Sequence, residues 1–168
     1  MSRSGAAGTR IALFGIVALA AAVGSAGAQG TVIITVPVAV SFAVTDVSRS
    51  TSGAPSVTTL SFVYVGLGLG KALRVSVQSD AASFSPPIGL SIPALKVTWN
   101  SVGASGGIGS GGTLSSSSFG LVFQSNPMGI VGASGRVDLS WTLAAPPSGI
   151  RSGNHQLTVR WKVESITP

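Results

Sequence analysis

The chain has no cysteine in its 168 residues. Disulfides, thiolate metal sites and thiol nucleophiles are therefore excluded, and so is a lipid anchor attached through an N-terminal cysteine. A small domain without disulfides depends on buried apolar surface and backbone hydrogen bonds for its stability. We therefore expect a fold that is indifferent to redox conditions.

Charged residues are also scarce: ten Lys and Arg, four Asp and Glu, and a single His. No two acidic residues lie within ten positions of each other, so the sequence has no pattern of metal ligands or of paired acids and bases. We expect no metal, no cofactor, no catalytic residues and no enzyme activity. The basic residues form no cluster with interleaved aromatics, which argues against a nucleic-acid partner.

The first 28 residues have the pattern of a secretory signal peptide. Arg3 and Arg10 flank a polar segment, an apolar run extends from Ile11 to Val23, and Ala26-Gly27-Ala28 supplies the small residues that a signal peptidase needs. The alternative is a retained membrane anchor, but the run fades into Gly, Ser and Ala, whereas a spanning helix needs about 20 strongly apolar residues. We predict cleavage after residue 28, no stable membrane anchor, and a single mature domain of residues 29–168 that is extracellular, at the cell surface or in the periplasm.

Apolar residues alternate with small residues through most of the mature chain. The longest example runs from Val32 to Val44, where every even position is apolar. Because successive side chains of a strand point to opposite faces, a period of two predicts half-buried β-strands. Seven strands are predicted, around residues 32–44, 60–64, 73–77, 97–99, 119–123, 137–143 and 157–163.

Segments rich in Ser, Gly and Pro separate these strands, and no segment has a helical period. Short strands with such connections predict an antiparallel, Ig-like β-sandwich. The expected connections are residues 48–56, 85–87, 103–112, 132–135 and 146–153. We interpret Gly103 to Gly112 as a loop, either disordered or able to close over a partner, because the entropy cost of glycine disfavours strand interiors.

Three tryptophans, Trp99, Trp141 and Trp161, occur in similar strand segments with apolar residues two positions away. This pattern predicts that all three lie in the core, since large aromatics dominate the cores of sandwiches. The alternative is an exposed aromatic platform that stacks on sugar rings.

Two glycine-rich motifs match patterns of enzymes. Gly103 to Gly107 fits the nucleophile elbow G-x-S-x-G around Ser105, and Asp138 and His155 follow in the order of α/β-hydrolases. Gly107 to Gly112 fits the dinucleotide fingerprint G-x-G-x-x-G. Each motif requires a helix directly after it, and none is predicted here, so neither is assigned a function. His155 is expected to pack or to hydrogen-bond at the end of the sheet.

The last predicted strand carries Arg160, Lys162 and Glu164 on one face. This face is either a solvated surface whose charges discourage edge-to-edge aggregation, or a contact surface for a neighbouring subunit or a cell-surface polymer.

The segment from Ser148 to Trp161 resembles the closing strand of bacterial secreted β-sandwiches, including pilin-like and spore-coat-protein-U-like domains. The resemblance implies a secreted Ig-like domain and draws attention to the long strand from Val32 to Val44, which would span about 43 Å. Pro37 offers a break in it. Either the strand switches between two sheets at Pro37, or Thr31 to Val36 is donated to a second copy, as in pilins.

These features predict a secreted, non-enzymatic structural or adhesive surface protein whose copies can assemble. An extracellular glycan- or ligand-binding module is the alternative. A secreted serine hydrolase that uses Ser105, Asp138 and His155 is a remote third hypothesis.

Overall fold

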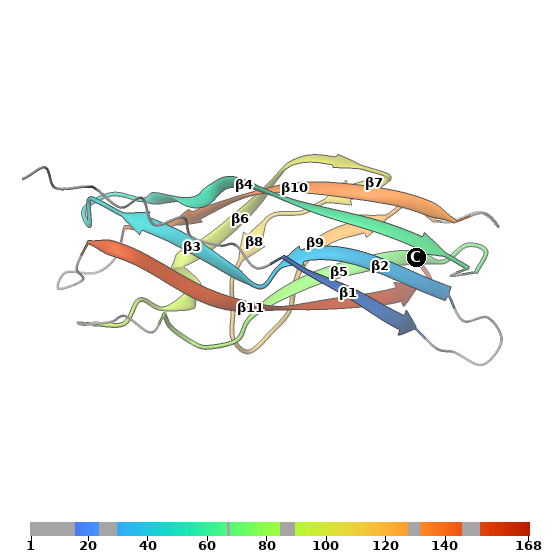
Figure 1. The fold of residues 1–168 in the computed structure, drawn as a ribbon, viewed down its shortest axis with the longest axis horizontal. Helices are drawn as coiled ribbons and strands as arrows, with labels where there is room; N and C mark the ends of the chain where they lie inside the picture. Colours follow the sequence, from blue (N-terminus) through green and yellow to red (C-terminus); the bar gives the residue numbers. More distant parts are fainter. Residues whose placement is uncertain (1–15, 24–29, 67, 85–89, 128–131, 146–151) are drawn as a thin grey trace, which may run out of the picture.

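The computed structural model describes residues 16–23, 30–66, 68–84, 90–127, 132–145 and 152–168. This part forms strands and one short 3-10 helix (Figure 1): β1 (Ile16–Val23), β2 (Gly30–Pro37), β3 (Ala39–Val44), β4 (Thr51–Val65), β5 (Ala72–Ser79), η1 (Ala94–Lys96), β6 (Val97–Ser105), β7 (Gly107–Gly109), β8 (Gly112–Thr113), β9 (Gly120–Ser125), β10 (Ala133–Leu143) and β11 (Gly153–Ile166). The prediction of an antiparallel all-β fold is confirmed. The structure has more strands than the seven predicted, because residues 32–44 form two strands, β2 and β3, and because β1, β7 and β8 lie outside the predicted strands.

The strands form one antiparallel sheet that curls on itself. One half contains β1, β2, β4, β10, β6 and β8, and the other contains β7, β9, β5, β11 and β3. A single residue pair, Phe42 with Gly53, connects β3 to β4 and thereby joins the two halves. The sheet is therefore nearly divided at this junction.

The change from β2 to β3 occurs at the predicted break. Residues Thr31–Thr35 of β2 pair with β4, whereas Ala39–Val44 of β3 pairs with β11 in the other half. Proline has no N–H to donate to a ladder, so Pro37 ends the first pairing and lets the chain cross over. Of the two alternatives, the structure has the chain change partners at Pro37, although between two halves of one sheet rather than between two sheets.

One apolar core lies between the two halves, with residues from β2 to β6 and β9 to β11. Trp99 and Trp141 are almost completely buried in it, and their ring centroids are 5.9 Å apart. Trp161 is only half-buried at the edge of the core, where its indole N–H donates to the carbonyl of Pro37 at 2.7 Å. The expected core position is therefore confirmed for two tryptophans and only in part for the third.

The stretch Gly103 to Gly112 is not a loop. It contains the end of β6, a turn at Gly106 with φ of 73°, all of β7 and the start of β8. The glycines allow close packing here: a Cβ at Gly112 would lie 2.5 Å from Cζ2 of Trp99, and one at Gly120 would also overlap this ring. Glycine is thus required at these positions by the bulk of a tryptophan from another strand.

Part of the predicted leader is a strand in this structure. The residues Ile16–Val23 of its apolar run form β1, which pairs with β2 over eight positions, from Ile16 with Pro37 to Val23 with Gly30. Arg3, Arg10 and Ala26–Ala28 lie outside the described residues, as do residues 85–87 and 146–151 of the predicted connections and the start of the segment 148–161.

Candidate functional site

The three residues of the hydrolase hypothesis lie on different strands. Asp138 is on β10 and Ser105 is at the end of β6, in the first half of the sheet, whereas His155 is on β11, opposite Phe42 of β3. The buried His155 ring has its centroid 6.3 Å from that of Phe84, in an edge-to-face arrangement. His155 was expected to pack or to hydrogen-bond at the end of the sheet, and its ring packs against Phe84.

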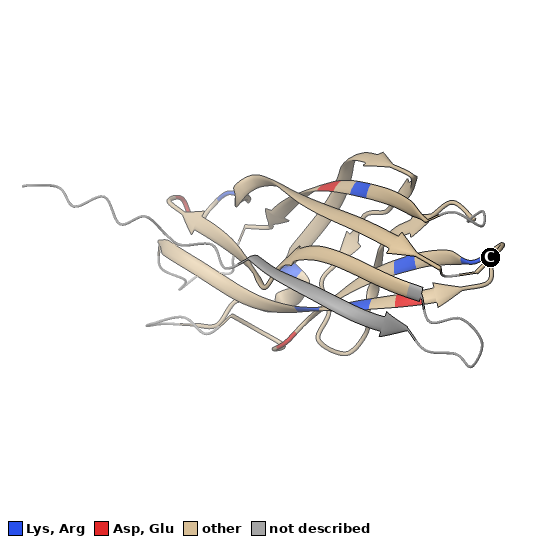
Figure 2. Ribbon diagram, turned by 45° about the vertical axis from the view of Figure 1, so that its right-hand side comes forward, with Lys and Arg blue, Asp and Glu red and all other residues tan. Residues whose placement is uncertain are grey.

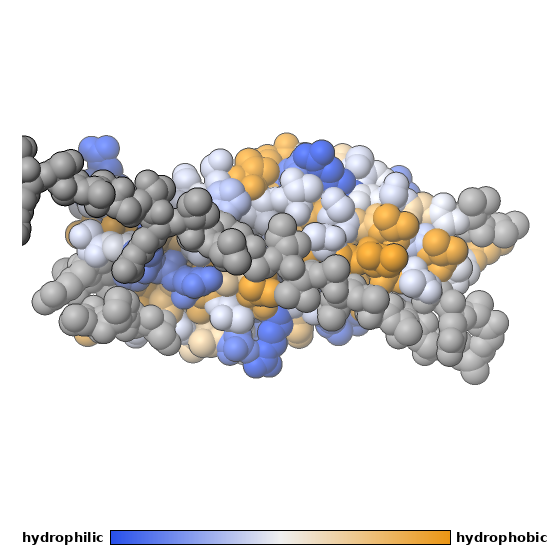
Figure 3. Space-filling view, in the orientation of Figure 1, coloured by the Kyte–Doolittle hydropathy of each residue, from blue (hydrophilic) through white to orange (hydrophobic). Residues whose placement is uncertain are grey.

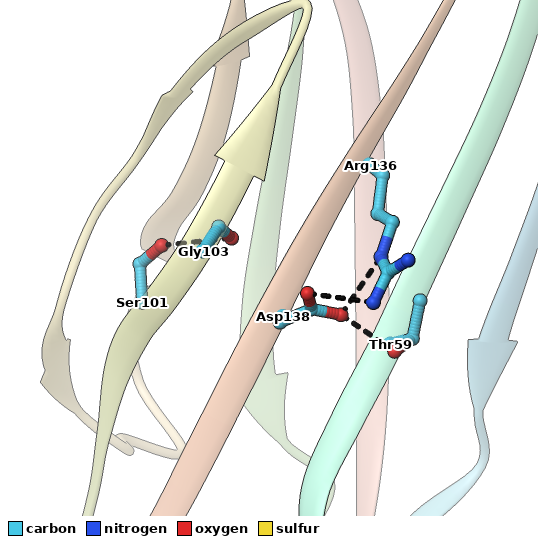
Figure 4. Close-up of polar contacts among 5 residues, drawn as sticks. All are labelled: Thr59, Ser101, Gly103, Arg136 and Asp138. Atoms are coloured by element: carbon cyan, nitrogen blue, oxygen red, sulfur yellow. Dashed lines mark hydrogen bonds and ion pairs between the residues drawn. The ribbon is translucent and has the colours of Figure 1, made fainter.

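Asp138 has partners of its own on the outer surface of the first half (Figure 4). Its carboxylate accepts hydrogen bonds from Oγ1 of Thr59 at 2.6 Å and from Nε and Nη2 of Arg136 at 3.0 Å and 2.8 Å. The hydrogen bond from Thr59 and the Arg136 guanidinium hold the pKa of this carboxyl below its ordinary value of 3.8. Asp138 is therefore an ionised member of a surface cluster that ties β10 to β4, rather than the orienting acid of a histidine.

The glycine motifs lack the context that their chemistry needs. A nucleophile elbow places its serine between a strand and a helix, but Ser105 is followed by the Gly106 turn and by β7. The dinucleotide fingerprint likewise opens a helix, but Gly107 to Gly112 covers β7 and the start of β8. Within the described residues, no group of three His, Asp or Glu side chains is placed to hold a metal ion.

Charges on β11 are paired with neighbours (Figure 2). Arg160 forms an ion pair with Asp80, and Nζ of Lys162 lies 2.7 Å from the carboxylate of Glu164. The same Nζ is 5.9 Å from the centre of the Phe119 ring. All four charged side chains are at least a third exposed, so this face has the features of a solvated outer surface.

A window interrupts the sheet between β2–β3 and β4. The strands pair at Thr35 with Ser61 on one side and at Phe42 with Gly53 on the other, with no ladder pair in between. Each of the two unpaired segments contains a proline, Pro37 or Pro55, and a proline cannot donate to a ladder. The window opens into a cavity of about 600 Å³.

The lining of this cavity is mostly apolar and includes no Lys, Arg, Asp or Glu among the described residues. Its members come from the β2–β3 segment, from the first half of β4, and from β10 and β11 (Thr35 to Ala43, Gly53 to Pro55, Val57 to Thr59, Trp141 and Asn154 to Gln156). The Nε1 of Trp141 is buried and has no acceptor within the described part of the chain. A buried N–H without a partner is costly, but this one does not face the cavity, because the atom is inaccessible although the cavity admits water-sized molecules.

The second candidate surface is the outer edge of β2 with the apolar side chains beside it. Ile33 on β2 and its cross-strand partner Val63 on β4 are each about half exposed, at 51% and 50%, and Val65 is 57% exposed. In Figure 3, apolar surface gathers over the part of β4 that runs beside β2. No charged residue occurs from Gly30 to Thr45.

The window was not predicted from the sequence. Pro37 was recognised as a break, but Pro55 lay in a segment that was interpreted as a connection. The two prolines could have indicated a gap in a ladder only if Pro37 and Pro55 were known to lie in strands that face each other. That pairing is a tertiary contact, and the sequence alone does not reveal it.

None of the helices in the described residues is long and apolar enough to cross a membrane. Comparison of the chain with protein-family models, with curated proteins and with solved structures gave no match.

Proposed function

We propose that the chain is a secreted, non-enzymatic structural or adhesive protein of the cell surface, and that its mature copies associate through the edge of β2. The two halves of the curled sheet then act as the layers of an Ig-like sandwich. The observation that carries the proposal is the uncharged edge of β2, which β1 alone covers among the described strands. β1 comes from the segment that the leader pattern assigns to the signal peptide.

The position of β1 fits this proposal. Among the described strands, β1 pairs with β2 alone. Cleavage after residue 28 would therefore leave every other ladder intact and would free one edge of β2 over the eight positions from Gly30 to Pro37. Such a free edge presents a row of unpaired N–H and C=O groups that is ready to pair with another strand.

The β2 edge lacks the usual protection against pairing. Soluble proteins guard free edges with charged side chains, bulges or central prolines. In β2 the only proline is the last residue, Pro37, and no side chain is charged. Antiparallel pairing of β2 with β2 of a second copy would continue the sheet, with the strand of the second copy in the place of β1 and its side chains beside Ile33. Apolar surface removed from water stabilises association by about 25 cal/mol per Å² before the entropic costs.

Edge pairing is a better mode than donation of the whole segment Thr31 to Val36. Val32, Ile34 and Val36 are each at most 5% exposed and belong to the core of their own chain. Donation would take these side chains out of their own core, at about 1.5–3 kcal/mol for each apolar position until the segment of a neighbouring copy fills it. Edge pairing leaves them in place.

The test starts from the full chain, expressed with its own leader in a secreting bacterial host. Mass spectrometry of the exported protein should show a chain that begins at Gln29, and light scattering should show association that increases with concentration. Ile33→Lys should abolish association, because it places a charge beside the edge. The matched control Leu95→Lys alters a side chain that is 64% exposed on η1 and should associate like the wild type.

Circular dichroism should show that both variants are folded. A chain that retains residues 1–28 would refute the signal peptide. A monomer at high concentration, or equal association of the two variants, would refute the β2 interface.

A further inference from the structure

The symmetry of the association through β2 follows from the use of the same strand in both copies. Two identical strands that pair antiparallel are related by a two-fold axis perpendicular to the sheet, so the residue on that axis lies opposite its own counterpart. The core-facing side chains of both copies then lie on one face of the joined sheet. The outward side chains of β2, which are Thr31, Ile33 and Thr35, lie together on the other face.

Ile33 is the residue that fits this axis best. It is 51% exposed with β1 in place, and it lies opposite Val63 of β4, which is 50% exposed. With Ile33 on the axis, the two Ile33 side chains would be direct neighbours across the interface, and Val63 of each copy would extend this apolar row at both ends. With Ile34 on the axis, each Ile33 would lie opposite Thr35 instead. The first register brings exposed apolar surface against apolar surface, which is the favourable arrangement.

The composition of β2 suits a strand that pairs with itself. A two-fold axis brings every charged side chain near it toward an equal charge, and like charges on adjacent strands are destabilising. β2 has no charged side chain, so self-pairing meets no such repulsion. With Ile33 on the axis, the new ladder would run from Gly30 to Val36 in each copy, and Pro37, which has no N–H to donate, would lie beyond its last pair.

Growth beyond two copies would require a second edge that is free to pair. In the described part of the chain, the strand order ends at β7 and β8, which have three and two residues. Very short edge strands are one of the means by which proteins prevent edge-to-edge pairing. The two-fold contact uses the β2 edge of both copies, so no equivalent edge is left for a third copy.

We propose that association through β2 closes at a two-fold dimer with Ile33 on the axis, and that it does not continue into a fibre. This inference rests on the proposed function, because it requires removal of the leader and pairing of β2 with β2. Since the axis is perpendicular to the sheet, the dimer would present the outer face of β4 and β10 twice on the same side. It would therefore act as a bivalent adhesive unit, in which the second contact with a surface is intramolecular.

Light scattering and single cysteines test this dimer in the exported protein. The wild type should reach twice the mass of one chain as its concentration increases, and no larger species should form. The chain has no cysteine of its own, so an introduced thiol reports on one position. Ile33→Cys, reduced and then oxidised with copper phenanthroline, should form a disulfide-linked dimer, because the two thiols lie opposite each other. Leu95→Cys, on the exposed η1, is the control for links formed by random collision.

Two further variants test the register. In the proposed ladder Thr31 lies opposite Thr35, so each of these residues is about 13 Å along the strand from its own counterpart, whereas a disulfide needs Cα atoms within about 7 Å. Thr31→Cys and Thr35→Cys should therefore remain unlinked when each is oxidised alone. An equal mixture of the two variants should form a linked heterodimer.

The outcomes separate the dimer from the proposed function on which it rests. A wild type that stays monomeric at high concentration would refute the β2 interface and the dimer together. Species that grow beyond two chains, while Ile33→Lys still abolishes association, would leave the β2 interface standing and overturn the closed dimer. A dimer in which Ile33→Cys links no better than Leu95→Cys, or in which Thr31→Cys or Thr35→Cys links alone, would overturn the position of the axis.

Discussion

The glycines around Trp99 give the sharpest test of how this fold is packed. A Cβ at Gly112 would lie 2.5 Å from Cζ2 and 2.7 Å from Cη2 of the indole, where ordinary contacts begin at 3.4 Å. The ring cannot withdraw easily, because its N–H donates to the carbonyl of Ser110 at 3.1 Å and the side chain is 1% exposed. Gly112→Ala therefore adds a methyl group to a filled space.

The expected loss of stability follows from two opposing terms. Overpacking of a filled core costs about 1–3 kcal/mol. Replacing glycine by alanine also lowers the conformational entropy of the unfolded chain, which stabilises the folded protein by about 0.4–1 kcal/mol. We expect Gly112→Ala to lower the free energy of unfolding by about 1–2 kcal/mol, which corresponds to a fall in Tm of about 2–8 °C for a domain of this size.

Urea unfolding followed by tryptophan fluorescence measures this loss. Gly103→Ala is the matched control, because its new Cβ would meet only the side chain of Asp138, with Oδ2 nearest at 3.3 Å. We expect this control to be neutral or slightly stabilising. In a Trp99→Leu background, Gly112→Ala should become nearly neutral, since the clash is with the indole. An equal effect of Gly112→Ala in both backgrounds would show that the glycine serves the backbone and not the ring.

Two further predictions concern polar residues. Asp138→Asn should reduce stability at pH 7, where the carboxylate is ionised and bound by Thr59 and Arg136. Because these partners lower the pKa of Asp138 in the folded state, the difference from the wild type should shrink as the pH falls below 3.8 in urea titrations, and a constant difference would contradict the cluster. Ser105 should not react with a fluorophosphonate probe, because β7 rather than a helix follows it; mass spectrometry that finds the adduct on Ser105 would revive the hydrolase hypothesis.

The alternation of apolar residues predicted the central strands well. In β10, the apolar side chains Val137, Leu139, Trp141 and Leu143 are all buried, and the intervening residues are only partly buried. The pattern is reliable here because both long neighbours, β4 and β6, fix the register and leave one face toward the core.

The same reasoning failed where another strand decides the structure. Residues 51–56 read as Thr-Ser-Gly-Ala-Pro-Ser, which is typical of a connection. They nevertheless begin β4, because Thr51 and Ser52 pair with Leu143 and Thr142 of β10. The glycines of β7 and β8 have no side-chain period to detect. Their close neighbours lie on other strands: Gln124 and Phe123 at Gly107, Ser101 and Val137 at Gly109, and Trp99 at Gly112.

The window and the exposed edge of β2 have a common physical origin in the segment from Gly30 to Val44. This segment belongs to both halves of the sheet, since it pairs with β4 before Pro37 and with β11 after it. A strand that leaves one half for the other must open its ladder with β4, which creates the window. The segment is also uncharged throughout; most of its even-numbered residues lie in the core, and β1 pairs with the edge of Gly30–Pro37 in the full chain. If the leader is removed as proposed, β1 is present until export. The uncharged edge of β2 would then become free to pair only outside the cytoplasm, where the mature protein works.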